Sequence, residues 1–149
     1  MICFSKASLA LSVFLIALPV TAFAETHYVK MLNRNETGVM PFEPDYLAIK
    51  PGDQVKFLAT DSGHNAATIK EMIPEGGKKF IGKINQEIEV TFDVPGIWGI
   101  KCSPHYAMGM VMLIQVGDTP ATANDLSSKL PKKAKERMEE ILSRQSANQ

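Results

Sequence analysis

The sequence is poor in the residues that carry most protein chemistry. Among its 149 residues there are two cysteines, Cys3 and Cys102, and three histidines. Basic and acidic residues are equal in number, 16 of each, so the chain also lacks a net charge. A protein without an excess of Lys and Arg lacks the electrostatic footprint of a nucleic-acid-binding protein, and we expect no nucleic-acid partner.

The first 24 residues have the pattern of a secretory signal peptide. Lys6 precedes an apolar run over residues 7–20, and Ala22-Phe23-Ala24 provides the small residues of a cleavage site. A membrane anchor is the weaker alternative, because the run is short for a bilayer span. We predict cleavage after Ala24, which leaves a mature chain of residues 25–149 with the size of one domain that has its own hydrophobic core.

Cleavage would also discard Cys3 and leave Cys102 as the only cysteine of the exported chain. A lone cysteine cannot form an internal disulfide, even in an oxidising compartment. Cys102 is therefore a buried inert residue, a reactive thiol or a metal ligand.

The pattern of the remaining chain is that of a mainly β protein. Short β-rich stretches lie at residues 26–32, 46–50, 55–59 and 88–92, and Pro-Gly turns lie at residues 51–52 and 95–96. An apolar run with β-branched residues follows at residues 111–116. About seven or eight short strands separated by turns predict a Greek-key β-sandwich.

The end of the chain is predicted to be helical, from about residue 124 to residue 147. An apolar stripe with helical spacing runs through Ala134, Met138, Ile141, Leu142 and Gln145. Pro131 suits a first helical turn, and oppositely charged pairs follow at i, i+4 spacing. We expect this helix to pack against the strands, because the stripe is narrow for a membrane-surface or partner helix.

The segment KCSPHYAMGM at residues 101–110 gathers a thiolate, an imidazole and two thioethers. Cysteine, two histidines and a methionine are the ligands of a type 1, blue-copper site, so Cys102 and His105 are candidate ligands together with Met108 or Met110. The spacing alone admits either methionine. The second histidine is predicted to be His64, from the loop DSGHNAA, while His27 lies in the first strand and reads as an ordinary, partly exposed side chain.

Other sites fit this set of residues less well. Structural zinc sites pair cysteines or histidines and rarely use methionine. A cysteine nucleophile would need an oxyanion hole, and no local signature of a cysteine hydrolase is present. A copper storage or delivery protein is the second functional hypothesis, although the extra Met/His clusters of such carriers are missing from the sequence, and a cysteine enzyme is the third.

The motifs GHN at residues 63–65 and CSPHYAMGM at residues 102–110 resemble those of the cupredoxins, and in particular of the pseudoazurin family. Further similar segments occur in the expected order: MLN at 31–33, FEP at 42–44, PGD at 51–53, MIPEG at 72–76, KIN at 83–85 and VGD at 116–118. The helical C-terminal extension is also typical of this family. The resemblance covers nearly the whole mature chain and implies a cupredoxin-like sandwich.

The resemblance implies one copper ion per chain, bound by His64, Cys102, His105 and Met110. It leaves Met108 as a residue of the exposed apolar face. Asn65 resembles the family residue whose amide donates to the thiolate sulfur and whose side chain ties the two ligand loops together. Pro104 stiffens the loop and has no N–H to donate.

The resemblance further implies a periplasmic one-electron carrier, and not an enzyme, in which copper cycles between Cu(I) and Cu(II). Its expected acceptor is a denitrification enzyme such as a copper-containing nitrite reductase, or another periplasmic reductase, and its expected donor is a c-type cytochrome or a similar protein. His105 is expected to present its ring edge to solvent as the electron port. We expect a monomer that does not insert into membranes.

Docking is expected to use a small, transient interface around His105. Its apolar part would comprise Pro104 and Met108, with Met40 and Pro41. Positive charge around it would come from Lys101, Arg34, Lys78, Lys79 and Lys83. Ser62 stands where many pseudoazurins carry lysine, so this sequence departs from the family at one position of the basic ring.

Overall fold

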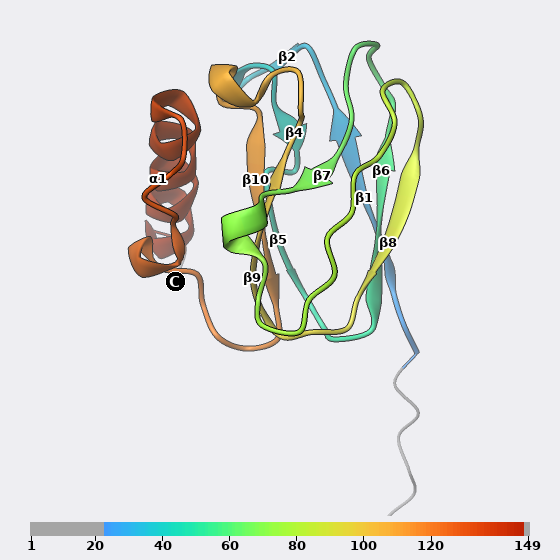
Figure 1. The fold of residues 1–149 in the computed structure, drawn as a ribbon, viewed down its shortest axis with the longest axis vertical. Helices are drawn as coiled ribbons and strands as arrows, with labels where there is room; N and C mark the ends of the chain where they lie inside the picture. The colour runs from blue at the N-terminus through green and yellow to red at the C-terminus, as the bar shows by residue number, and fades with distance from the viewer. Residues whose placement is uncertain (1–22, 148–149) are drawn as a thin grey trace, which may run out of the picture.

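Two β-sheets packed face to face, with one helix outside them, make up residues 23–147, the part of the chain that this computed structural model describes (Figure 1). The predicted signal peptide, residues 1–24, lies almost entirely outside the described residues. One sheet has the strand order β4-β1-β6-β8 and the other has the order β5-β10-β9-β7. The prediction of a mainly β sandwich is confirmed.

The first sheet comprises β1 (Thr26–Met31), β4 (Phe42–Glu43), β6 (Asp53–Leu58) and β8 (Ile88–Phe92). The second comprises β5 (Tyr46–Ile49), β7 (Ala67–Thr68), β9 (Gly96–Lys101) and β10 (Val111–Val116). A separate hairpin is formed by β2 (Arg34–Asn35) and β3 (Gly38–Val39). Three 3-10 turns complete the strand region: η1 (Lys70–Met72), η2 (Tyr106–Met108) and η3 (Ala123–Asp125). The strands of only two residues carry no periodicity, and for this reason the sequence did not predict them.

Strand β10 explains why its sequence is an uninterrupted apolar run. It lies between β5 and β9, pairing in parallel with the former and antiparallel with the latter. Met112 and Ile114 belong to the core between the sheets, whereas Val111 and Leu113 belong to a second cluster beneath the helix. Side chains alternate between the two faces of a strand, so burial on both faces requires apolar residues throughout.

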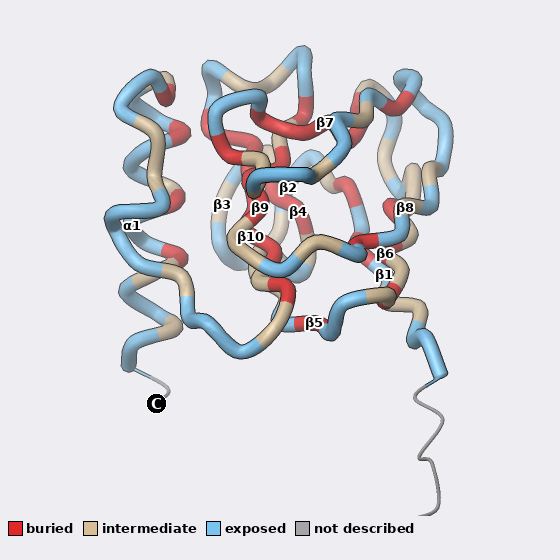
Figure 2. The backbone as a smooth tube through the Cα atoms, turned by 60° about the horizontal axis from the view of Figure 1, so that its bottom comes forward, coloured by how far each residue is buried: buried red, intermediate tan, exposed pale blue. Residues whose placement is uncertain are grey.

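Aromatic side chains fill much of the space between the sheets, where buried residues line the inner faces (Figure 2). The Phe42 and Phe57 rings meet edge to face with their centroids 6.1 Å apart. Phe92 and Trp98 meet in the same way at 5.1 Å. Phe80 lies between these pairs, next to both Phe57 and Phe92. Such edge-to-face pairs add about 0.5–1.5 kcal/mol each to the gain from burial.

The C-terminal helix, α1 (Lys132–Ala147), covers the outer face of the second sheet. Its stripe residues Ala134, Met138 and Ile141 are fully buried there, as predicted. The helix begins directly after Pro131, whose carbonyl accepts the Lys135 N–H at 2.9 Å. Pro131 disfavours helical backbone at residue 130, so α1 does not extend past it, and the predicted helical region further upstream contains only the short turn η3.

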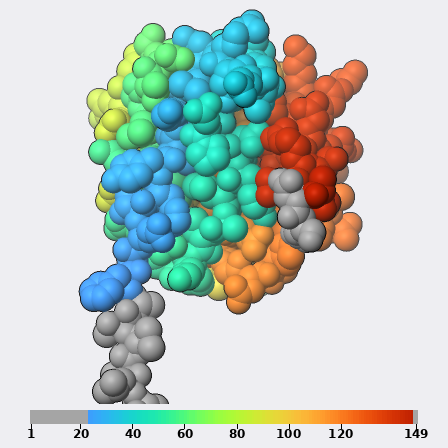
Figure 3. All heavy atoms as spheres, turned by 180° about the vertical axis from the view of Figure 1, so that it is seen from behind, coloured from blue at the N-terminus to red at the C-terminus, as the bar shows by residue number. Residues whose placement is uncertain are grey.

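The two ends of the described chain lie on different sides of the molecule. Seen from behind, the N-terminal strand and the C-terminal helix are separated by the sandwich (Figure 3). Near the N-terminus, His27 Nε2 lies 3.2 Å from Asp53 Oδ2, and the histidine side chain is partly exposed, as predicted. No helix within residues 23–147 is long and apolar enough to cross a membrane.

Candidate metal centre

Three predicted ligands converge at one end of the sandwich. Cys102 Sγ lies 3.7 Å from His64 Nδ1 and 3.6 Å from His105 Nδ1, and the two Nδ1 atoms are 3.1 Å apart. Cys102 directly follows β9, while His64 and His105 come from separate loops. His27, in β1, does not belong to this group.

The donor distances fit a single metal ion. Bonds of about 2.0 Å to nitrogen and about 2.3 Å to thiolate sulfur, as found at zinc, bring donors around one ion within about 4 Å of one another. All three observed distances are in this range. A thiolate with two imidazoles suits copper, and the fully buried Met110 thioether belongs to the same core cluster as Cys102.

His64 is almost fully buried and is held in one orientation by Asn33. Its Nε2 lies 2.9 Å from Asn33 Oδ1, an atom that only accepts hydrogen bonds, so Nε2 carries the proton. The lone pair of the neutral ring is therefore on Nδ1, which faces Cys102 and His105. Burial, and to a smaller extent the neighbouring His105, lowers the pKa of His64 and keeps the ring neutral.

Cys102 is fully buried at the junction of β9 and the ligand loop. Burial raises the pKa of its thiol, and hydrogen bonds from the backbone N–H groups of Asn65 and His105 act in the opposite direction. Burial makes the free thiolate unfavourable, so a bound cation is the natural counter-charge for it.

Backbone hydrogen bonds close the loop that carries His105 and Met110. The Cys102 N–H donates to the Met110 carbonyl at 3.0 Å, and the Met110 N–H donates to the His105 carbonyl at 3.1 Å. The short turn η2 lies between them and ends at Gly109, whose φ of 89° is in the left-handed region. Met110 is fully buried, whereas 42% of Met108 is exposed, so the two candidate methionines lie in opposite environments.

Asn65 connects the His64 loop to the Cys102 loop. Its Oδ1 accepts the Ser103 N–H at 2.7 Å, and its Nδ2 donates to the Gly82 carbonyl at 2.9 Å. Asn65 is 3% exposed, and its bond to Gly82 is buried. The next residues along the Gly82 loop also contribute, because the Asn85 N–H donates to the His64 carbonyl at 2.9 Å.

Asn33 and Asn85 are site residues to which sequence reasoning assigned no role. Both contact the His64 loop from segments far away in the chain, and a single asparagine carries no pattern of its own. They stand in the segments MLN and KIN, which were noted only as similar to a known family. Their position in these segments was the only feature of the sequence that could have indicated a role at the site.

The predicted docking residues have unequal exposure. Pro104 and Met108 are exposed and His105 is half-buried, so its ring can reach the surface. Arg34 is exposed in β2, and Lys101 Nζ lies 4.7 Å above the Tyr106 ring. Pro41 is buried directly before β4, so its predicted place on the exposed apolar face is wrong.

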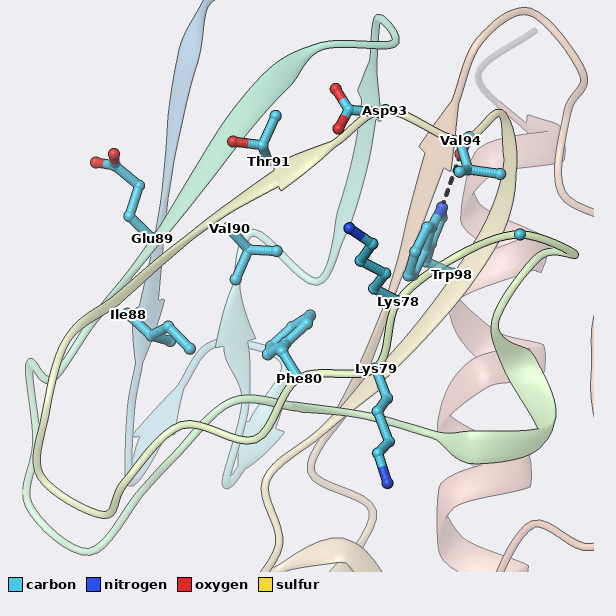
Figure 4. A pocket seen from close by; sticks show the side chains of 11 residues that line it. Lys78, Lys79, Phe80, Ile88, Glu89, Val90, Thr91, Asp93, Val94 and Trp98 are labelled. Carbon is cyan, nitrogen blue, oxygen red and sulfur yellow. Dashed lines mark hydrogen bonds between the residues drawn. The ribbon is translucent and has the colours of Figure 1, made fainter.

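The predicted basic residues line more than one recess. Lys79 lines a recess of about 250 Å³ together with Lys101 and Ser103, beside the ligand loop. Lys78 and Lys79 both line a second cleft, next to β8 and Trp98, and Figure 4 shows their side chains pointing in opposite directions. Of these two lysines, Lys79 alone also lines the recess beside the ligand loop.

Comparison with known proteins gives consistent matches. A family model described as copper binding proteins, plastocyanin/azurin family, matches residues 29–117. Pseudoazurin from Paracoccus pantotrophus is 48% identical over 126 residues, which cover 84% of this chain and 87% of that protein. The crystal structure of pseudoazurin from Methylobacterium extorquens AM1 matches with a TM-score of 0.75 and 41% identity, covering 80% of this chain and 98% of that one. Native pseudoazurin from Hyphomicrobium denitrificans matches with a TM-score of 0.72 and 36% identity, covering 80% and 97% respectively.

Proposed function

Since this chain belongs to the pseudoazurins, within the plastocyanin/azurin family of copper-binding proteins, we propose that it shuttles single electrons between proteins of the periplasm. Members of this family are copper electron carriers and not enzymes, so redox partner proteins are part of the function. The proposed ligands of its one copper ion are His64, Cys102, His105 and Met110. The convergence of three donor atoms within 4.8 Å of one another is the observation that carries the proposal.

Copper bound by these residues would supply one-electron chemistry, as Cu(II) and Cu(I). The chain itself has to hold the ligands in nearly the same positions in both states, because large movements slow electron transfer. Asn33 fixes the His64 ring, and Asn65 fixes the distance between the His64 and Cys102 loops. The burial of Cys102 and Met110 excludes water from the sulfur ligands.

The proposed route for the electron is the His105 ring. This ligand is half-buried, whereas His64, Cys102 and Met110 are buried, so His105 is the ligand nearest to solvent. The exposed Pro104 and Met108 flank it and would make the apolar centre of a small docking surface. Lys101 and Arg34 would add positive charge that steers an acidic partner.

The proposed partners are periplasmic. Export rests on the predicted signal peptide, residues 1–24, with a mature domain of residues 25–149. The proposed acceptor is a copper-containing nitrite reductase or another periplasmic reductase, and the proposed donor is a c-type cytochrome or a similar protein. We expect the carrier to act as a monomer, because transient electron-transfer contacts are small.

An absorption spectrum of the purified copper form tests the site. We expect an intense visible band from charge transfer between the Cys102 thiolate and Cu(II), and its loss in Cys102→Ser, which serves as the control. A copper form without such a band would contradict the proposed blue-copper site. Stopped-flow oxidation of the reduced protein by nitrite reductase then tests the role, since a copper storage protein would release its metal readily and show little redox turnover.

A further inference from the structure

Arg137 of helix α1 makes a contact with the copper end of the molecule that helix packing alone does not require. Its Nη2 donates to the carbonyl of Val39, in the β2–β3 hairpin, at 2.9 Å. The two residues are 98 positions apart in the sequence. The bond therefore joins the C-terminal helix directly to the segment that leads into β4.

The Val39 carbonyl anchors one end of the Arg137 guanidinium. Its Nη1 is buried and has no hydrogen-bond partner among residues 23–147. Arg137 also forms none of the ion pairs found in that part of the chain. The bond to Val39 is therefore the contact through which the Arg137 guanidinium can position another segment of the described chain.

The same end of the helix also contacts the ligand loop. A Cβ atom added at Gly109 would lie 2.8 Å from the Lys133 carbonyl oxygen, so the loop between His105 and Met110 lies directly against the first turn of α1. Tyr106, in the η2 turn, packs against the cluster that contains the buried helix residues. Helix α1 is thus in contact with both the hairpin and the loop.

These two segments meet in one surface recess of about 320 Å³. Val39 and Met108, which are 38% and 42% exposed, line it together with four charged residues of α1: Lys133, Glu136, Arg137 and Glu140. Met108 is the residue assigned above to the docking surface. The relative position of Val39 and Met108 therefore depends on the helix that both segments contact.

We propose that Arg137 is a positioning residue, which holds the β2–β3 hairpin against the ligand loop and so fixes the shape of the docking surface beside His105. The proposal rests on the proposed electron-carrier function for its last step, the effect on docking. Its first step, the fixed hairpin, does not depend on copper.

The test compares Arg137→Met with Arg144→Met in the copper-loaded protein. Arg144 is a matched control, because it joins the same helix to Asp45 two turns further along and its replacement removes the same charge. Hydrogen exchange of the Met40 amide reports on the hairpin, since its N–H donates to the Asn33 carbonyl at 2.8 Å. We expect Arg137→Met to speed this exchange about tenfold or more without lowering the thermal midpoint, and Arg144→Met to leave the exchange unchanged.

Steady-state oxidation by the partner reductase then separates docking from chemistry. We expect Arg137→Met to raise KM several-fold with kcat and the visible band unchanged. Met40 exchange that stays slow, or that rises equally in both variants, would overturn the positioning role, and an unchanged KM would overturn its link to docking. Failure of the proposed function is seen separately, as the absence of the visible band in the unmodified protein.

Discussion

The side chain of Asn65 joins the two ligand loops through Ser103, whose backbone N–H donates to Asn65 Oδ1 at 2.7 Å. A second bond from Asn65 Nδ2 to Ser103 Oγ, at 3.1 Å, connects the same two residues. His64 and Cys102 are their immediate chain neighbours. The Asn65–Ser103 pair therefore sets the separation of two proposed copper ligands.

Replacing Asn65 by Ala should therefore damage both the fold and the site. The change leaves the partly buried Ser103 N–H and the buried Gly82 carbonyl without their partner, and we expect a loss of about 2–4 kcal/mol in the free energy of unfolding of the metal-free protein. Ser103→Ala is the matched control, because it removes one bond and leaves the backbone contact in place. Urea unfolding of both variants measures the difference, and equal losses would contradict the assignment of the tie to Asn65.

Asn33→Ala should weaken copper binding without unfolding the protein. The variant loses the acceptor that holds the proton on His64 Nε2, and loss of such an outer contact typically costs about 10–100-fold in metal affinity. Asn33→Asp keeps an acceptor oxygen at the same position and should retain most of the affinity. Competition titration with a copper chelator measures both variants, and circular dichroism checks the fold. Equal affinities in all three proteins would argue against this role of Asn33.

The sequence was informative where its signal was local and incomplete where contacts join distant segments. Cys102 and His105 stand on one loop with Met108 and Met110, so chemistry and spacing predicted this loop as a metal site, and the resemblance to the pseudoazurins favoured Met110 as the ligand. Asn33 and Asn85, which hold the His64 loop, are single polar residues. Their partners lie 31 and 22 positions away in the sequence, and no periodicity indicates such contacts. The outer helix was predicted from its apolar stripe, but its bond from Arg137 to Val39 depends on tertiary packing alone.

Asp53 should make the stability depend on pH in the acid range. Burial acts to raise its pKa, but hydrogen bonds from the backbone nitrogens of Glu25 and Lys50 and the neighbouring His27 outweigh burial and leave the pKa below its ordinary value. Because the folded carboxylate binds its proton less readily than the unfolded one, its contribution is present above about pH 4 and is lost as the pH falls through the folded pKa.

Asp53→Asn should flatten this acid loss. We expect the free energy of unfolding at neutral pH to fall by about 1–3 kcal/mol, with a smaller further decrease below about pH 4 than in the unmodified protein. Asp93→Asn, at an exposed position, makes the same charge change and should leave the acid profile as it was. Urea unfolding of the metal-free protein at several pH values gives the profiles. Parallel profiles for Asp53→Asn and the unmodified protein would disprove the linkage.

Met110 and Met108 should respond oppositely to replacement by Ala. Met110 is fully buried, so its truncation leaves a cavity and should cost about 2–5 kcal/mol of unfolding free energy. It should also change the visible spectrum of the copper form, because the Met110 thioether is a proposed copper ligand. Met108→Ala, at an exposed position, should change stability by less than about 0.5 kcal/mol and leave the spectrum as it is. An altered spectrum in Met108→Ala alone would reverse the assignment.

Lys101 should contribute to partner association, and Lys78 should not. Lys101 lines the recess beside Ser103 together with Lys79, whereas Lys78 lines the cleft next to Trp98. Gln at either position removes the same charge, so the two variants have equal net charge and differ in where the charge was lost.

Steering by charge acts on the association rate and is screened by salt, with a Debye length of about 10 Å at 0.1 M. We therefore expect Lys101→Gln to slow association with the reductase at low ionic strength and to approach the rate of the unmodified protein at high salt, while Lys78→Gln follows the unmodified protein throughout. Stopped-flow mixing across ionic strength measures these rates, and equal slowing by both variants would mean that overall charge, and not the surface beside the ligand loop, guides the partner.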